Sequence, residues 1–278
     1  MEKILLNIYR FIFYWGGAYK FNYHIYRIAL RGIGVLNSEG PEVTGENHFL
    51  RKLKRYADLK TIIDVGANDG GYAQQLRSYF PKAKIYAIEP HPQTFRRLIL
   101  IAKKNNISAY NMGLGNYMGK SYLWDFADDA ELKHTQPTST LASGIKEVIE
   151  NLHKQKSKSY EFEMNTLDNF AKREKIERID FLKIDIEGNE LAVLQGSKNL
   201  LRKNRILFIQ FEFNEMNVYN RTFFKDFIEM LPDYIIYRMM PRGLYKLCPY
   251  RPSTHEIFAF QNIIAAHKSV AHVVDKFK

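Results

Sequence analysis

Cysteine is almost absent from this chain of 278 residues: it contains only Cys248, so no disulfide bond can form within it. The Cys and His spacing that is typical of zinc sites is missing as well. A protein without disulfides fits a reducing compartment, and we expect it in the cytoplasm. Stability must then come from a hydrophobic core, for which a content of 46% hydrophobic residues is sufficient.

Long apolar runs are also lacking, and no segment is long enough to cross a bilayer. The most hydrophobic one, MEKILLNIYRFIFYW at the N-terminus, is interrupted by Lys3, Asn7 and Arg10 and has no small-residue cleavage site. Its apolar positions 4, 5, 8, 11 and 12 fall on one face of a helix. We expect this helix to pack on the core. The alternative is a helix that lies on a membrane surface, since Trp, Tyr and basic residues flank the apolar face.

Acidic residues are outnumbered, with 30 Asp and Glu against 41 Lys and Arg, which gives a formal net charge of +11. This excess suits a polyanion, an anionic membrane surface or an acidic substrate, and equally a basic surface without a special partner. No basic run interleaved with aromatic residues resembles an RNA-binding module. Charge by itself therefore does not predict a nucleic-acid partner.

Strand-like and helix-like segments alternate from residue 61 onward. The strand-like segments are TIIDVGA, AKIYAIEP, SAYNMGLG, IDFLKIDIEG and ILFIQFEF. Because these strands are apolar on both faces, they predict a Rossmann-like, doubly wound α/β fold around a mostly parallel sheet. The later segments YIIYRMM, GLYKLC and EIFAFQN, joined by short turns, predict an antiparallel C-terminal edge.

The pattern divides the chain into three parts: an N-terminal helical extension over 1–43, the α/β domain over 44–262, and a C-terminal helical tail over 263–278. Within the domain, residues 119–168 form a long insertion that includes a predicted helix, IKEVIENLHKQ, and a predicted strand, SYEFEMN. Long insertions in compact domains often act as substrate lids. His134 and the hydroxyls of PTSTLASG could contact a polar acceptor there, or could simply be solvated.

The glycine-rich turn after the first strand lacks what phosphate-binding turns need. It reads Gly66-Ala67-Asn68-Asp69-Gly70-Gly71, without the Lys or hydroxyl of a P-loop and with Asn68 where a dinucleotide fingerprint has its second glycine. Acidic groups in this turn suit a ligand that carries positive charge. S-adenosylmethionine carries an ammonium and a sulfonium and no phosphate, and Asp64 can hold the ammonium directly or through water.

A second acidic residue, Glu89, ends the next strand 23 residues after Gly66. At this place and spacing a carboxylate accepts hydrogen bonds from ribose hydroxyls. Because NAD also carries ribose, Glu89 alone does not exclude it. The missing middle glycine, however, opposes a nicotinamide-dependent oxidoreductase.

Asp185 and Glu187 end the fourth strand, at the edge where open parallel sheets bind ligands. Two carboxylates this close repel, so one has a raised pKa unless a cation bridges them. Either residue could act as the general base that activates a hydroxyl. Alternatively both could hold a divalent ion such as Mg²⁺, with Glu212 as a third ligand.

Purely structural roles are the alternative for the two carboxylates. Glu187 could cap the following helix, and Asp185 could pair with Lys183 or another neighbour. Lys183 shares the strand but is expected to point away from Asp185, so it is not assigned to catalysis. His91, two positions after Glu89, could reach the rim of the cofactor or act as a base.

Several segments between residues 44 and 262 form a recognisable set: TGENHFL, IIDVGANDGGYA, IYAIEPHPQTF, NMGLGN, MNTLDNF, IDFLKIDIEGNELAVLQGSKNLL and FIQFEFNE. In these segments the chain resembles the FkbM-type methyltransferases, which use S-adenosylmethionine. It implies an O-methyltransferase acting on sugars, polyketides or related natural products, and bacterial members often accompany surface-polysaccharide genes. It says nothing about the N-terminal extension or the C-terminal tail.

The resemblance also implies which positions hold the cofactor. The methionine end is expected at the turn, the ribose at Glu89, and the adenine along Asn111–Leu114. The expected cofactor residues are Asp64, Gly66, Ala67, Asn68, Gly70, Glu89, Pro90, Gly113, Leu114 and Asp185. The expected catalytic residues are Asp185, Glu187 and His91.

Two rival functions are a nucleic-acid methyltransferase and a non-catalytic nucleoside-binding module. Base-modifying enzymes often carry an Asn/Asp-Pro-Pro-aromatic motif after the fourth strand, where this chain reads DIEG. The intact acidic residues argue against a module that has lost activity. We therefore predict O-methylation of a sugar or related polyol, on a small molecule or a glycan that an anionic carrier could bear. Metal dependence and oligomeric state stay open.

Overall fold

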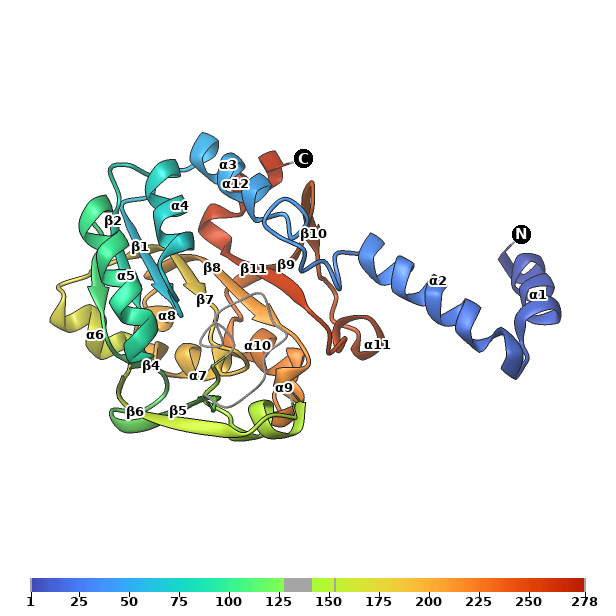
Figure 1. Cartoon of the computed structure of the whole chain (residues 1–278). Helices are drawn as coiled ribbons and strands as arrows, with labels where there is room; N and C mark the ends of the chain where they lie inside the picture. Colours follow the sequence, from blue (N-terminus) through green and yellow to red (C-terminus); the bar gives the residue numbers. More distant parts are fainter. Residues whose placement is uncertain (1, 128–141, 153, 278) are drawn as a thin grey trace.

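The computed structural model describes residues 2–127, 142–152 and 154–277 (Figure 1). Within them, an eight-stranded sheet forms the centre. Its order is β10 (Gly243–Lys246), β9 (Tyr234–Met240), β11 (Gln261–His267), β8 (Ile206–Phe213), β7 (Ile179–Ile184), β1 (Thr61–Val65), β2 (Lys84–Ile88) and β3 (Ser108–Tyr110). The strands from β8 to β3 pair in parallel, whereas β11 is antiparallel to both β8 and β9. The predicted fold, a mostly parallel sheet with an antiparallel edge, is confirmed.

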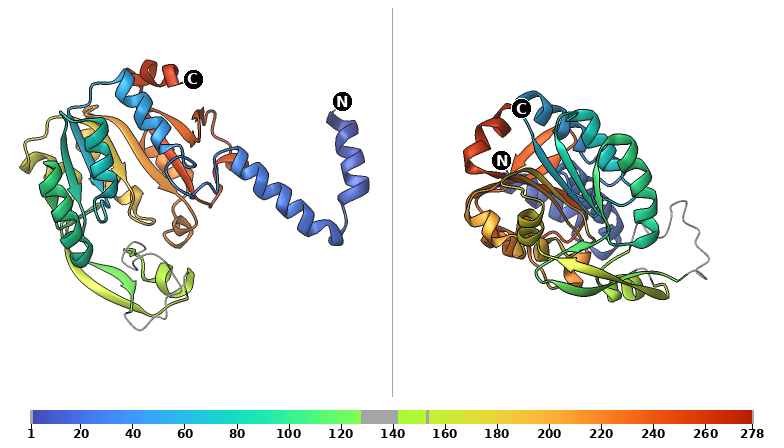
Figure 2. Two further views of the ribbon diagram at one scale, coloured as in Figure 1. Left: turned by 45° about the horizontal axis from the view of Figure 1, so that its top comes forward. Right: turned by 90° about the vertical axis from the view of Figure 1, so that its left-hand side faces the viewer.

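Helices cover both faces of this sheet (Figure 2). On one face lie α3 (Glu46–Tyr56), α4 (Gly71–Tyr79), α5 (Pro92–Asn105) and α12 (Ala271–Val274), whose apolar residues share one core. On the other lie α6 (Leu167–Arg173), α7 (Glu190–Gln195), α8 (Lys198–Arg202) and α10 (Phe224–Met230), which form the second core. Successive strand residues point to opposite faces, so Ile62 belongs to the first core and Ile63 to the second.

A small second sheet lies beyond the carboxyl ends of the parallel strands. It has the order β4 (Gly113–Leu114), β6 (Ser157–Asn165) and β5 (Gly119–Phe126). The insertion predicted over 119–168 thus starts with β5 and returns along the antiparallel β6, and the helix expected between them is a short π-helical segment, η3 (Val148–Leu152). The third predicted strand, SAYNMGLG, is divided between the two sheets. His134 and most of PTSTLASG lie outside the described residues.

The C-terminal tail expected to be helical from residue 263 begins instead as strand β11. Residues 263–266 are fully buried and alternate between the two cores, because this strand is inserted between β8 and β9. Helical structure starts only afterwards, with η4 (Lys268–Val270), α12 and η5 (Asp275–Phe277). Two short helices, α9 (Met216–Tyr219) and α11 (Pro252–His255), complete the domain.

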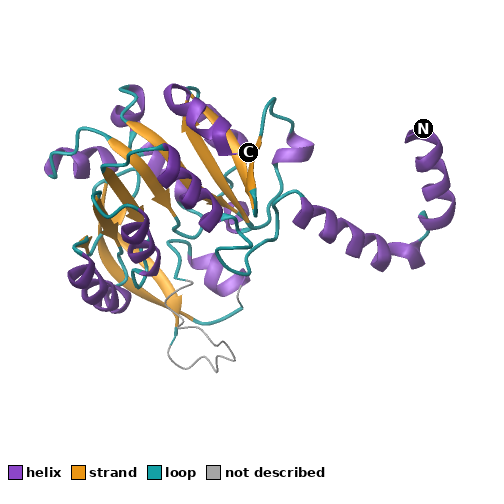
Figure 3. Ribbon diagram, turned by 90° about the horizontal axis from the view of Figure 1, so that it is seen from above, coloured by secondary structure: helices purple, strands orange, loops and turns teal. Residues whose placement is uncertain are grey.

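The N-terminal helices α1 (Glu2–Phe13), η1 (Gly16–Ala18) and α2 (Tyr19–Gly32) project from the body as a bent arm (Figures 1 and 3). The expectation that the first helix packs on the core is wrong, because Phe11 is 92% exposed and Ile4 65%. Helical periodicity reveals an apolar face but not what covers it. In the described part of the chain, no helix has the length and hydrophobicity to span a membrane.

Candidate functional site

The carboxyl ends of β1, β2, β7 and β8 meet at one edge of the sheet and bring most of the predicted site residues together. We use the name acidic cluster for the carboxylates at this edge. Its members are Asp64, Asp185, Glu187, Glu190 and Glu212. Parallel strands direct their C-terminal residues to the same edge, which is why residues far apart in sequence meet here.

Asp64, near the end of β1, is completely buried. Neither of its carboxylate oxygens has a hydrogen-bond partner among the described residues. Burial raises the pKa of Asp64 to about 6; Lys183 opposes the shift, and the negative charge of Asp185 adds to it. Because buried carboxylates are nearly always hydrogen-bonded, this side chain suits a positively charged donor reached directly or through water.

Two backbone N–H groups of the glycine turn are already bonded within the protein. The N–H groups of Gly66 and Ala67 both donate to the carbonyl of Ile88, at 2.9 and 3.0 Å. Gly66 has a left-handed φ of 81°, and a Cβ at this position would lie 1.8 Å from the backbone oxygen of Asp185. The glycine is therefore required so that the turn can pack against the end of β7.

The substitution Gly66→Ala is expected to lower the free energy of unfolding by roughly 1–3 kcal/mol, because it combines a strained φ with a backbone clash. Gly40→Ala is the matched control. Gly40 also has a positive φ, 114°, but nothing lies within 4 Å of a Cβ built there. Urea denaturation of both variants measures the difference, and equal losses would show that packing against β7 is unimportant.

Glu89 lies at the end of β2 and ties the turn to the following helix. Its Oε2 accepts the N–H of Asn68 at 3.0 Å, and its Oε1 accepts the N–H of His91 at 2.7 Å. Burial raises the pKa of Glu89 to about 7, against the effect of these two hydrogen bonds. A carboxylate oxygen can accept a second hydrogen bond, so Glu89 retains acceptor capacity for hydroxyl groups.

His91 is fully buried and caps α5. Its Nδ1 accepts the N–H of Thr94 at 3.4 Å, its Nε2 lies 3.2 Å from Oδ2 of Asp125, and its ring packs edge-on against Tyr160. These contacts link α5 to the small sheet. They enclose the ring within the protein, and we do not retain His91 as a catalytic candidate.

Lys183 and Asp185 point to the same side of β7 and form an ion pair, with 2.7 Å between Nζ and Oδ2. The expectation that they point in opposite directions is wrong, because side chains two positions apart in a strand share a face. The ammonium also lies 4.5 Å from the centre of the Tyr72 ring. Burial lowers the pKa of Lys183, but Asp185, Asp64 and Glu46 together offset this and raise it. A buried cation thus sits among the acidic residues.

The remaining carboxylates hold their protons more tightly than usual. Burial, followed by the negative charge of Asp185, raises the pKa values of Glu187 and Glu212 well above the ordinary value. Glu190 has a pKa raised to about 7 by burial, and its Oε1 accepts the N–H groups of Ile186 and Gly188. It is therefore Glu190, and not Glu187, that closes the turn before α7.

The predicted metal ligands are not arranged as a metal site. Over residues 2–127, 142–152 and 154–277, no group of three or more His, Cys, Asp or Glu side chains has an arrangement that could hold a metal ion. Asp185 instead pairs with Lys183, and Glu212 lies 3.5 Å from the amide nitrogen of Asn214. A divalent ion would require these side chains to rearrange.

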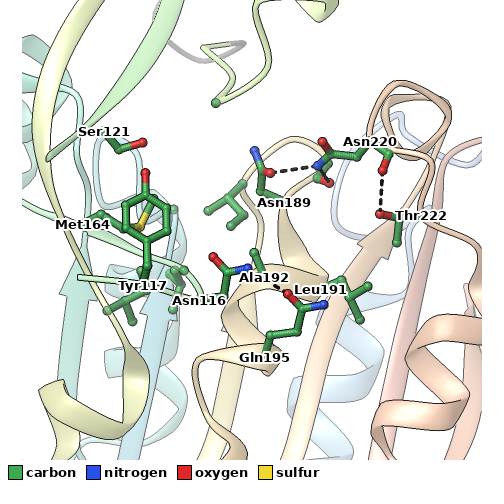
Figure 4. A pocket seen from close by; sticks show the side chains of 18 of the residues that line it. Asn116, Tyr117, Ser121, Met164, Asn189, Leu191, Ala192, Gln195, Asn220 and Thr222 are labelled. Carbon is green, nitrogen blue, oxygen red and sulfur yellow. Dashed lines mark hydrogen bonds between the residues drawn. The ribbon is translucent and has the colours of Figure 1, made fainter. Parts of the chain in front are cut away.

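A cavity of about 910 Å³ opens beside the acidic cluster, between the main sheet and the small one (Figure 4). Its lining includes apolar residues and four of the predicted cofactor residues: Gly66, Pro90, Gly113 and Leu114. The lining also has a polar part. Asp185 and Glu187 do not line the cavity, but Ile186, Gly188 and Asn189 around them do.

Carboxamide side chains line the polar part of the cavity in two pairs (Figure 4). Asn220 donates to Oδ1 of Asn189 at 2.8 Å and to the carbonyl of Gly188 at 2.7 Å. Asn116 donates to Oε1 of Gln195 at 3.0 Å. Each amide retains donors or acceptors for a polar ligand, as in sites that recognise hydroxyl groups.

Sequence reasoning missed these carboxamides and the polar residues around Lys183. Gln210 donates to Oε1 of Glu46 at 2.8 Å and accepts from the Tyr72 hydroxyl at 3.0 Å. The alternation of β7 would have placed Lys183 correctly. For Asn220 no local pattern exists, because its place depends on how the loop after β8 folds back.

Comparison with known proteins gives matches of three kinds. A family model described as "Methyltransferase FkbM domain" matches residues 64–239. The chain is 23% identical over 185 residues to a protein of Sinorhizobium fredii named 2-O-methyltransferase NoeI, covering 66% of this chain and 75% of that one. It is 24% identical over 174 residues to a Haloferax volcanii protein named hexuronic acid methyltransferase AglP, covering 61% and 63%.

Among solved structures, a precorrin-6y C5,15-methyltransferase of Geobacter metallireducens aligns with 84% of this chain and 91% of its own. The sequence identity is 13% and the TM-score 0.41, too low for an argument about function. The geometry of the edge and the family match therefore carry the functional interpretation.

Proposed function

Because the chain belongs to the methyltransferase FkbM family, and is thus an S-adenosylmethionine-dependent methyltransferase, we propose that it methylates a hydroxyl group of a sugar or related polyol. The observation that carries the reaction class is the family match over residues 64–239. The names of the two relatives, one a 2-O-methyltransferase and one a hexuronic acid methyltransferase, support the acceptor class.

The residues at the sheet edge fit the cofactor. Asp64 offers a buried carboxylate without a protein donor, suited to an ammonium, and Glu89 offers acceptors for ribose hydroxyls. Met112 and Leu114 belong to the apolar lining of the cavity, against which a flat base can pack. When bound, S-adenosylmethionine supplies the methyl group from its sulfonium, and the protein contributes alignment.

A sugar hydroxyl is a poor nucleophile until its proton is accepted. We assign this proton to Glu187, with Asp185 as the alternative. Asp185 is engaged in an ion pair with the Lys183 ammonium, whereas the raised pKa of Glu187 makes the carboxylate of Glu187 a stronger base than an ordinary one. The residues on both sides of Glu187 line the cavity, which supports this assignment.

The polar lining around Asn189 and Asn220 is the proposed acceptor site. Here Asn189→Ala is expected to raise the KM for the acceptor roughly 3- to 10-fold, because it removes one neutral hydrogen-bonding group. The affinity for S-adenosylmethionine should not change. Asn199→Ala, on the exposed surface of α8, is the control. Steady-state kinetics with both substrates varied decides this, and a rise in cofactor KM alone would contradict the assignment.

The reaction itself is tested in cells with and without the protein. We expect glycans of the first to be heavier by one methylene group per modified sugar, as measured by mass spectrometry. The net charge of +11 supports an acceptor on an anionic lipid or nucleotide carrier, and the single Cys248 supports a reducing compartment such as the cytoplasm. Methylation found only on nucleic acid would overturn the proposal.

A further inference from the structure

The N-terminal arm, residues 2–33, exposes most of the large hydrophobic side chains that are exposed in the described part of the chain. The α/β domain has two hydrophobic cores built from its own residues, so the arm is not needed to complete them. Isolated helices of this length are marginal in water, and contiguous exposed apolar surface usually marks an interaction site. We therefore expect the exposed apolar residues of the arm to bind another surface.

The two helices of the arm contact each other and form a defined helix-turn-helix unit. The Tyr9 hydroxyl donates to Oδ1 of Asn22, whose amide donates in turn to the carbonyl of Phe13 at 3.1 Å. The Phe13 and Phe21 rings stack with their centres 4.8 Å apart. These contacts fix the bend between α1 and α2 while leaving the outer faces uncovered.

The uncovered face of α1 is apolar. Ile4, Ile8 and Phe11 follow one another at helical spacing and are 65%, 53% and 92% exposed. Trp15, also 65% exposed, follows at the bend. Large apolar residues next to Trp at the end of a short helix are typical of segments that enter the interface of a bilayer.

The face of α2 adds positive charge in a regular row. Lys20, His24, Arg27 and Arg31 recur at steps of four, three and four residues and therefore share one side of the helix. Exposed tyrosines lie along one side of this row (Tyr19, Tyr23 and Tyr26), and exposed apolar residues lie along the other (Phe21, Ile25 and Ile28). Arg31 is paired with Glu39, and this arrangement lets Lys20 and Arg27 reach phosphates while the flanking rings enter the headgroup region.

Charge decides between the two plausible occupants, a membrane and a second copy of this chain. The arm has five Lys and Arg residues, and its acidic residue is Glu2. Two arms packed together would bring like charges face to face, which is unfavourable, whereas an anionic membrane neutralises them. We infer that residues 2–33 dock the enzyme on an anionic membrane surface.

Full-length protein is to be sedimented with vesicles of phosphatidylcholine, alone or mixed equally with phosphatidylglycerol. We expect binding to the mixed vesicles that weakens with salt, and a blue shift of Trp15 fluorescence. The double substitution Ile8→Gln and Phe11→Gln should lower the partition coefficient more than tenfold, since it removes two apolar anchors but keeps helix formers. Leu100→Gln, on the equally exposed surface of α5, is the matched control and should bind normally.

Neutralising the basic row gives an independent readout. Lys20→Gln with Arg27→Gln should reduce binding to the mixed vesicles by about fivefold for each charge removed, with little change for neutral vesicles. If the variant with Ile8→Gln and Phe11→Gln binds the mixed vesicles as well as the wild type does, the inference is overturned. A dimer in the absence of vesicles that the same variant converts to monomer would also overturn it, because it would identify a second copy as the partner. Neither result depends on the methyl acceptor.

Discussion

Replacing Asp64 by Asn is expected to weaken S-adenosylmethionine binding by roughly 10- to 100-fold, the cost of one charge-assisted hydrogen bond. The same change should make the ligand-free protein less sensitive to pH. Asp64 is fully buried without a protein donor, so its negative charge destabilises the folded protein. Binding of a cation offsets this destabilisation. Affinity for the cofactor should therefore fall in this variant, whereas the free energy of unfolding at neutral pH should rise.

The size of the stability effect follows from the pKa. Burial raises the pKa of Asp64 from 3.8 to about 6, which corresponds to roughly 3 kcal/mol. Because the folded protein holds this proton more tightly than the unfolded chain, the contribution is fully present below pH 4 and is lost as pH rises through 6. Between pH 4 and pH 7, the wild type should lose roughly 3 kcal/mol more unfolding free energy than Asp64→Asn.

Urea denaturation at several pH values and calorimetric titration with S-adenosylmethionine measure the two effects. Asp69→Asn is the control, because Asp69 belongs to the same turn but is exposed, and Asn can still accept the N–H of Gly71. An Asp64→Asn protein that binds the cofactor with full affinity would show that this carboxylate serves the fold and not the ligand.

Replacing Glu187 by Gln should lower kcat roughly 10²- to 10⁴-fold, the range for loss of a general base, with little change in cofactor affinity. Glu215→Gln, an exposed neighbour of the same charge, is the control and should retain the rate. Burial together with the negative charges of Asp185 and Glu190 raises the pKa of Glu187. Since the base acts when ionised, kcat/KM should rise with pH and level off above the ordinary carboxylate range.

Asp185→Asn distinguishes the two candidate bases. If Glu187 is the base, removing the neighbouring negative charge lowers its pKa, so the rising limb of the pH profile moves to lower pH and activity persists. If Asp185 is the base, the variant loses the rate at every pH. Persistence of activity in exhaustively EDTA-treated protein would further show that these carboxylates act without a divalent ion.

The glycine turn shows what a local sequence pattern can predict and what it cannot. The turn, its Asp64 and the spacing to Glu89 predicted a nucleoside cofactor without phosphate, and the structure places these residues at one edge. The pattern did not reveal that Gly66 is needed for contact with Asp185, more than a hundred residues away, because that contact exists only once β1 and β7 pair.

The sequence alone determined the alternation of strands and helices, the parallel sheet and the class of cofactor, because these depend on periodicity and on short spacings within one strand-turn-helix unit. Only the tertiary structure decided that residues 261–267 enter the sheet as a strand, that carboxamides from separate loops line one cavity, and that the N-terminal helices stand free of the core. These features depend on which distant segments meet, and an apolar or polar face is the same in sequence whichever partner covers it.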